Sequence, residues 1–72
     1  MRFQTNITEY NESITYQRKC LRRIDGLLYN VTINQTIQFL YDGKKISCKV
    51  INIVDSVYED IIYRYIEVLI MN

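Results

Sequence analysis

The two glycines of the chain each follow an aspartate, in Asp25-Gly26 and Asp42-Gly43, and each pair lies between runs that alternate apolar and polar residues. An Asp-Gly pair favours a two-residue turn with both residues at positive φ, and the twist of such a turn matches that of the strands it joins. Each pair therefore predicts a β-hairpin. Because a hairpin turn also fixes which residues lie opposite each other, these pairs constrain the fold strongly.

The turn at Asp42-Gly43 predicts the clearer hairpin. It places these residues opposite each other: Tyr41 and Lys44, Phe39 and Ile46, Ile37 and Cys48. Side chains that lie directly opposite each other share a face, so most of the larger apolar side chains gather on one side, with Leu40 as the exception. A register one residue away would destroy this separation.

The turn at Asp25-Gly26 predicts a second hairpin, in which a strand that ends near Ile24 pairs with Leu27–Ile33. Arg18 and Arg22 interrupt the apolar face of the first strand. The alternative is a helix from about Ser13 to Arg23, with Gly26 just beyond its end. The many β-branched and aromatic residues favour the strand.

The last part of the chain predicts a long strand, Ile61 to Ile70, with apolar residues on both of its faces. It is expected to lie beside Lys45–Val54, after a loop that contains Asp55, Ser56, Glu59 and Asp60. A first strand is expected near Phe3 to Thr8. The chain is therefore predicted to form one all-β domain over residues 1–72: a small antiparallel barrel or rolled sheet of five or six strands, SH3-like or OB-like.

The composition excludes several kinds of chemistry. No histidine is present, which removes most catalytic triads and zinc sites, and the net charge is only +1. We therefore expect no enzyme activity, no metal and no cofactor. Cys20 and Cys48 are expected to be buried thiols, with a disulfide as the alternative.

The expected location is the cytoplasm, because the N-terminus lacks an apolar stretch of signal-peptide length and no segment is apolar for long enough to span a membrane. The chain has no Ala, Pro or Trp and is rich in Ile, Asn and Tyr. This bias fits an AT-rich genome and suggests a phage or a low-GC bacterium.

Basic residues concentrate in two places, and they form the candidate nucleic-acid site: Arg18, Lys19, Arg22, Arg23, Lys44 and Lys45. If both places border one surface that also carries Tyr16, Tyr29 or Tyr41, cations and rings together suit single-stranded nucleic acid or RNA.

A protein partner or self-association is the favoured alternative, because the net charge is nearly neutral and the basic run is short. The candidate contact residues are Tyr63, Tyr65 and Leu69, and the simplest version is a homodimer joined through Ile61–Ile70. The predicted function is that of a non-enzymatic accessory protein, either an inhibitor of a host factor or a subunit of an assembly.

The segment Tyr16–Val54 joins a basic strand, a strand that ends in Phe39 and a hairpin that leads into a valine-containing strand. In this order of elements it resembles the middle of PUA-like and ASCH-like barrels, which are associated with RNA. Asn34 and Gln35 stand where that family has Gly and Asp. The resemblance implies a small β-barrel and RNA as a partner.

Overall fold

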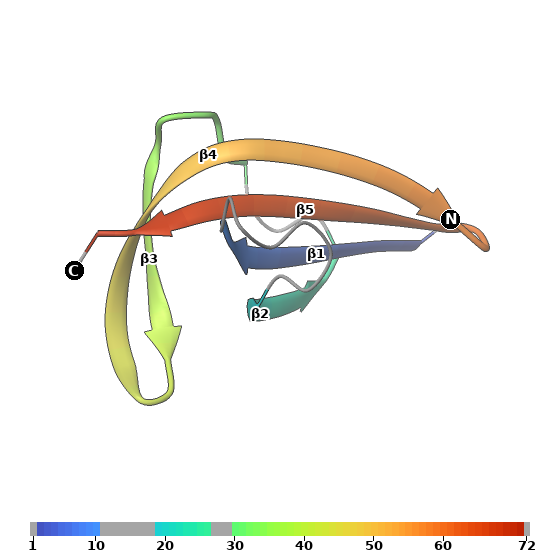
Figure 1. Cartoon of the computed structure of the whole chain (residues 1–72). Coiled ribbons are helices and arrows are strands. Elements are labelled where there is room, and N and C mark those ends of the chain that lie inside the picture. Colours follow the sequence, from blue (N-terminus) through green and yellow to red (C-terminus); the bar gives the residue numbers. More distant parts are fainter. Residues whose placement is uncertain (1, 11–18, 27–29, 72) are drawn as a thin grey trace.

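The computed structural model describes residues 2–10, 19–26 and 30–71. These residues form five strands: β1 (Arg2–Glu9), β2 (Cys20–Asp25), β3 (Thr36–Tyr41), β4 (Lys44–Tyr58) and β5 (Ile61–Ile70). The strands build one sheet in the order β2-β1-β5-β4-β3, rolled into a half-barrel (Figure 1). The predicted all-β fold with a rolled, five-stranded sheet is confirmed.

The sheet is mixed, which differs from the expected antiparallel arrangement. β1 lies parallel to β5 along its whole length, from Arg2 opposite Ile61 to Glu9 opposite Val68. The other three pairs of neighbouring strands are antiparallel. A parallel pair needs a long connection between its strands, and here that connection is the rest of the sheet.

The hairpin of β3 and β4 has the predicted register, with Tyr41 opposite Lys44 and Phe39 opposite Ile46. Asp42 and Gly43 both adopt positive φ, 52° and 75°. This is the two-residue turn that Asp-Gly favours, because glycine adopts positive φ without steric cost and aspartate tolerates it.

The predicted hairpin at Asp25-Gly26 is wrong. Asp25 is the last residue of β2, which pairs with β1, and the described residues 30–35 are not in a strand. Of the pair Asp25-Gly26, Gly26 has positive φ, 100°, and Asp25 does not. The N–H of Gly26 donates to the carbonyl of Phe3 at 2.7 Å. Asp25 and Gly26 therefore bind β1 instead of forming a tight hairpin.

The choice between a helix and a strand before this turn is settled only in part. Residues Cys20–Asp25 form a strand, as favoured, and residues 11–18 lie outside the described part of the chain, as do residues 27–29.

The hairpin of β4 and β5 is longer than expected, because β4 continues to Tyr58, which lies opposite Ile61. Asp55 and Ser56 were predicted in a loop but belong to the strand. Only Glu59 and Asp60 form the turn, with φ values of 49° and 63°. These residues adopt the left-handed conformation without the help of a glycine, which costs free energy.

Replacing the turn Glu59-Asp60 by Asn-Gly is therefore expected to stabilise the protein by about 1 kcal/mol, measured by urea unfolding. The matched control is Gly43→Ala, in the equivalent turn of the other hairpin. A Cβ at Gly43 meets no atom within 4 Å, so only the strain at positive φ acts there, and it should cost about 1 kcal/mol. A variant of the β4–β5 turn that is no more stable than the parent would contradict this interpretation.

β4 bends so that one strand belongs to both halves of the sheet. Residues up to Lys49 pair with β3, and residues from Cys48 onward pair with β5. The register with β5 shifts between Val50 and Asn52, and such an extra residue bends a strand and increases its twist. Figure 1 shows the result, in which β3 crosses the direction of β1 and β5.

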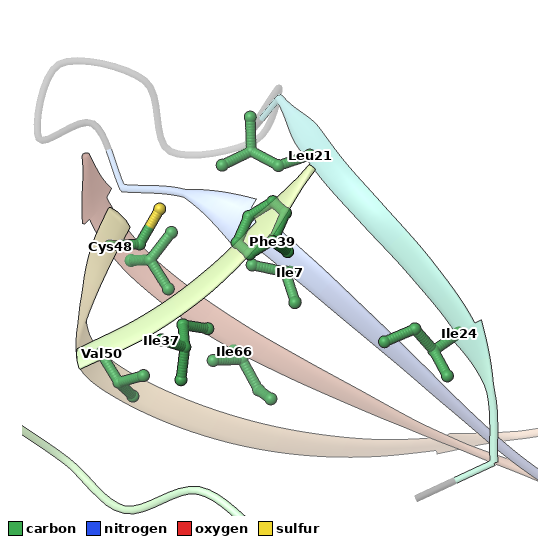
Figure 2. Close-up of a cluster of buried hydrophobic side chains, with 9 residues drawn as sticks. Ile7, Leu21, Ile24, Ile37, Phe39, Cys48, Val50 and Ile66 are labelled. Carbon is green, nitrogen blue, oxygen red and sulfur yellow. The ribbon is translucent and has the colours of Figure 1, made fainter. Parts of the chain in front are cut away.

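The bend creates a concave inner face, where the core lies (Figure 2). We call the opposite side of the sheet the outer face. The core contains side chains from all five strands: Ile7, Leu21, Ile24, Ile37, Phe39, Cys48, Val50, Ile66 and Val68. Because even the two edge strands contribute, the core holds the rolled shape together.

Candidate functional site

The candidate contact residues Tyr63, Tyr65 and Leu69 all lie on the outer face of β5. Ile66 and Val68 are fully buried in the core on the inner face, so the odd-numbered residues of β5 point outward. Tyr65 and Leu69 are 37% and 44% exposed, and Tyr63 is partly exposed. The structure therefore brings all three to one side of a central strand.

Two residues of β4 extend this surface. Val54 lies directly opposite Tyr65, and Tyr58 lies opposite Ile61, two residues before Tyr63. Val54 and Tyr58 are both exposed. We call the group of Val54, Tyr58, Tyr63 and Tyr65 the tyrosine face. It is continuous, because Val54 lies directly opposite Tyr65, Tyr63 is two residues from Tyr65, and Tyr58 is the diagonal neighbour of Tyr63.

Val54 and Tyr58 were missed by the sequence analysis. Their run, Val54–Tyr58, does not alternate apolar and polar residues, so no local signal identified the whole run as part of a strand. Val54 was predicted as the end of a strand, and the polar residues Asp55 and Ser56 after it favoured a loop, so Tyr58 was not expected beside β5.

A band of buried polar side chains separates Leu69 from the tyrosine face. Glu67 is buried, although it points to the outer face, and its Oε1 accepts a hydrogen bond from Asn52 Nδ2 at 3.2 Å. On the other side of Tyr65, the side chain of Asn6 is buried and accepts from Arg23 Nε at 3.3 Å. These cross-strand hydrogen bonds hold the strands that carry the tyrosine face.

The described cations of the candidate nucleic-acid site are divided between the two faces. Arg22 lies opposite Ile7, whose side chain is in the core, whereas Arg23 lies opposite Asn6 on the outer face. In the same way, Lys44 lies opposite Tyr41, and Lys45 on the other face lies opposite Leu40. Arg18, Tyr16 and Tyr29 lie outside the described residues.

Lys19 and Tyr41 are brought together from the two edges of the half-barrel. Lys19 precedes β2, Tyr41 ends β3, and the Lys19 Nζ lies 4.9 Å from the centre of the Tyr41 ring. A hydrogen bond to Tyr41 and, more weakly, the charges of Glu9 and Asp42 raise the pKa of Lys19. This contact of a cation with a ring spans the opening between β2 and β3.

The two cysteines are both unpaired thiols, so the disulfide alternative is wrong. Cys48 is buried in the core, as expected, and burial raises the pKa of its thiol. The expectation that Cys20 is buried is wrong, because this residue begins the edge strand β2 and is exposed.

An ion pair lies on the inner face beyond the end of the core. Arg64 donates to both carboxylate oxygens of Asp55, from Nε at 2.9 Å and from Nη2 at 3.0 Å. The hydrogen bond to Arg64 lowers the pKa of Asp55, and the same bond raises the pKa of Arg64. This pair explains why an aspartate is accommodated inside β4.

The lowered pKa of Asp55 predicts a stability difference that depends on pH. The ion pair contributes above the pKa of an unfolded aspartate, about 4, and its contribution is lost as the pH falls through the lower pKa of the folded state. Asp55→Asn is expected to cost less than about 1 kcal/mol at pH 7, because Asp55 is 46% exposed and solvent screens the pair.

The measurement is urea unfolding of both proteins at pH 7 and pH 3. The difference between them should shrink at the lower pH, and an equal difference at both pH values would contradict the assignment.

Three comparisons, with protein-family models, with curated proteins and with solved structures, give no match for this chain. Within the described ranges, the structure has no cluster of three His, Cys, Asp or Glu residues that could hold a metal ion. A search of residues 2–10, 19–26 and 30–71 finds no helix that is long and apolar enough to span a membrane.

Proposed function

We propose that this chain is a non-enzymatic binding module that contacts another protein through the tyrosine face and Leu69. The observation that supports this proposal is the pair of Tyr65 and Val54, which lie side by side on the two long strands and are exposed despite their apolar surface. Apolar patches on small domains mark interaction sites, and tyrosine is enriched in protein interfaces.

A homodimer joined through Ile61–Ile70 cannot form by pairing the backbones of two β5 strands. β5 lies between β1 and β4 and is paired on both sides, so it cannot add a strand from a second copy. A dimer built on β5 would instead pack two tyrosine faces against each other.

The biological setting is part of the proposal. The AT-rich composition favours a phage or a low-GC bacterium, in which a small binding protein acts as an inhibitor of a host factor or as a subunit of an assembly. The exposed, unpaired Cys20 is typical of a reducing compartment, and we therefore place the protein in the cytoplasm.

Single-stranded nucleic acid is the second candidate. Arg23, Asn6 and Tyr65 follow one another across β2, β1 and β5 on the outer face, so a cation borders the tyrosines. Bases stack on aromatic rings while arginine binds phosphate. The resemblance to PUA-like and ASCH-like barrels points to the same class of partner, RNA.

Matched double variants distinguish these candidates. Tyr63→Ser with Tyr65→Ser removes the rings, and Arg22→Glu with Arg23→Glu reverses the cations of β2. Each variant is first compared with the parent by circular dichroism and urea unfolding. Chromatography with light scattering then measures complexes, at low and high salt, with a bacterial lysate fraction and with short RNA and DNA.

A protein complex that persists at high salt, is kept by the arginine variant and is lost by the tyrosine variant supports the protein-binding proposal. A complex with RNA or DNA that dissolves at high salt and is abolished by the arginine variant overturns it in favour of the second candidate.

A further inference from the structure

The two edges of the half-barrel differ in how they are protected. β2, at one edge, contains Arg22, Arg23 and Asp25, and charges of this kind discourage the addition of another strand. β3, at the other edge, has the sequence TIQFLY, without a charge, a proline or a glycine. Natural proteins rarely leave such an edge open unless a partner uses it.

The hydrogen bonds of β3 show which of its backbone groups are free. Tyr41 and Lys44 flank a two-residue turn, so odd-numbered residues of β3 bond to β4. The N–H of Val50, which donates to the Gln35 carbonyl at 2.9 Å, continues the same alternation. Thr36, Gln38 and Leu40 therefore direct their N–H and C=O groups away from the sheet, and no backbone group within the described ranges bonds to them.

Lysines surround this edge. On the outer face of β4, Lys49 lies opposite Thr36 and Lys45 lies opposite Leu40. On the inner face, Lys44 lies opposite Tyr41, and Lys19 contacts the ring of Tyr41. Asp42 in the turn is the one acidic residue of the described β3–β4 hairpin, residues 36–49. Glu9 of β1 also acts on Lys19, and the four lysines outnumber these two acidic residues, so the surroundings of the free edge carry a net positive charge.

We propose that the free edge of β3 binds an extended, acidic segment of a partner protein, which adds to the sheet as a sixth strand. The site is distinct from the tyrosine face and does not depend on it. Residues of the added strand that lie opposite Thr36, Gln38 and Leu40 point to the outer face. Lys45 and Lys49 are on β4, two strand spacings away, which is a distance of about 10 Å. Glutamate side chains placed there come within reach of the lysines.

The alternate residues of the added strand point to the inner face, beside Ile37 and Phe39 of the core, and are therefore apolar. The recognised pattern is an alternation of acidic and apolar residues. A second copy of β3 fits less well, because TIQFLY has no acidic residue and would bring the same lysines with it.

The probe is an acetylated and amidated hexapeptide that alternates Glu and Val, compared with one that alternates Lys and Val. Hydrogen exchange of the 15N-labelled protein is measured with each peptide. The Glu/Val peptide should protect the amides of Thr36, Gln38 and Leu40 and leave those of Ile37 and Phe39 unchanged, since these already bond to β4. We expect it to bind at least about tenfold more tightly than the Lys/Val peptide.

Gln38→Pro tests whether the peptide pairs with the backbone of β3. Proline removes the N–H of residue 38, which points away from β4, and leaves the hydrogen bonds between β3 and β4 in place. Gln38→Ala is the matched control, since both variants lose the side-chain hydrogen bond to Ser47 Oγ at 3.1 Å but only one loses the N–H. Peptide binding should be lost with proline and kept with alanine.

Lys49→Glu is a second test that does not depend on how well the proline variant folds. It should reduce the preference for the Glu/Val peptide over the Lys/Val peptide. Equal binding of the two peptides by the parent protein, or protection of the same amides that rises with protein concentration alone, would overturn the proposal. The latter outcome would identify a second copy as the occupant.

The variant Tyr63→Ser with Tyr65→Ser should bind the peptide normally. A failure of peptide binding at β3 can therefore be told apart from a failure of the proposed function of the tyrosine face.

Discussion

Ile66→Ala is expected to lower the free energy of unfolding by about 4 kcal/mol. Ile66 is 0% exposed and lies on the central strand β5, between Ile7 of β1 and Ile53 of β4. The substitution removes buried apolar surface and leaves a cavity in the middle of the core, where neighbouring strands that are hydrogen-bonded on both sides cannot close it easily. For a chain of 72 residues, whose total stability is on the order of 5 kcal/mol, this loss is most of the available free energy.

The measurement is urea unfolding followed by circular dichroism. Ile66→Val keeps the fold measurable if the alanine variant is largely unfolded, and it should cost about 1 kcal/mol. Val57→Ala is the matched control, because Val57 is on the same sheet but 64% exposed, and it should change stability by less than about 0.5 kcal/mol. Equal losses for Ile66→Val and Val57→Ala would show that β5 does not have its inner face in the core.

Phe39→Ala is expected to cost between about 3 and 5 kcal/mol. Phe39 is on the edge strand β3, yet it belongs to the same buried cluster as Leu21 of β2, the opposite edge strand (Figure 2). Its ring therefore holds together two strands that share no ladder of hydrogen bonds. Without the ring, the half-barrel should open along this line.

Hydrogen exchange distinguishes this effect from a general loss of stability. Under native conditions, a variant with a smaller side chain, Phe39→Leu, should lose protection at the β2 amides more than at those of β5. Leu40→Ala, next in the chain and 63% exposed, is the control and should leave exchange unchanged. Uniform loss of protection in Phe39→Leu would mean that the ring is not the specific link between the edges.

The local parts of the fold could be predicted from the sequence. The register of the β3–β4 hairpin follows from Asp42-Gly43 together with the alternation of apolar residues, and both are contained within fourteen residues, Thr36–Lys49. The bounds of β5 follow from its alternation in the same way. In each case neighbours in sequence supply the information.

The remaining pairings could not be predicted, because they join distant segments. Asp25-Gly26 permits a hairpin, but β2 gains more by pairing with β1, where Gly26 binds Phe3. From the sequence, Asp55 was predicted in a loop, because nothing near it in the chain indicates that Arg64, on the next strand, binds it. The parallel pairing of β1 and β5 has no local signal at all.

The candidate surface was predictable only as a set of residues on one face. Alternation along β5 groups Tyr63, Tyr65 and Leu69 on one side, and the structure confirms this grouping. Which side faces solvent depends on the curvature of the whole sheet, and this curvature arises from the irregular register of β4 near Val50.

The pairing of β1 with β5 also determines the order of events during synthesis. β1 is made early, but in the finished sheet it lies between β2 and β5, so it lacks one neighbour until Ile61–Ile70 has left the ribosome. A two-stranded β1–β2 unit is at best marginally stable in water. The nascent chain therefore carries an incomplete sheet until β5 has emerged, and contacts between residues so far apart in sequence make folding slow. This delay leaves β1 and β2 exposed to other chains, and a chaperone that binds extended apolar segments would have its longest opportunity there.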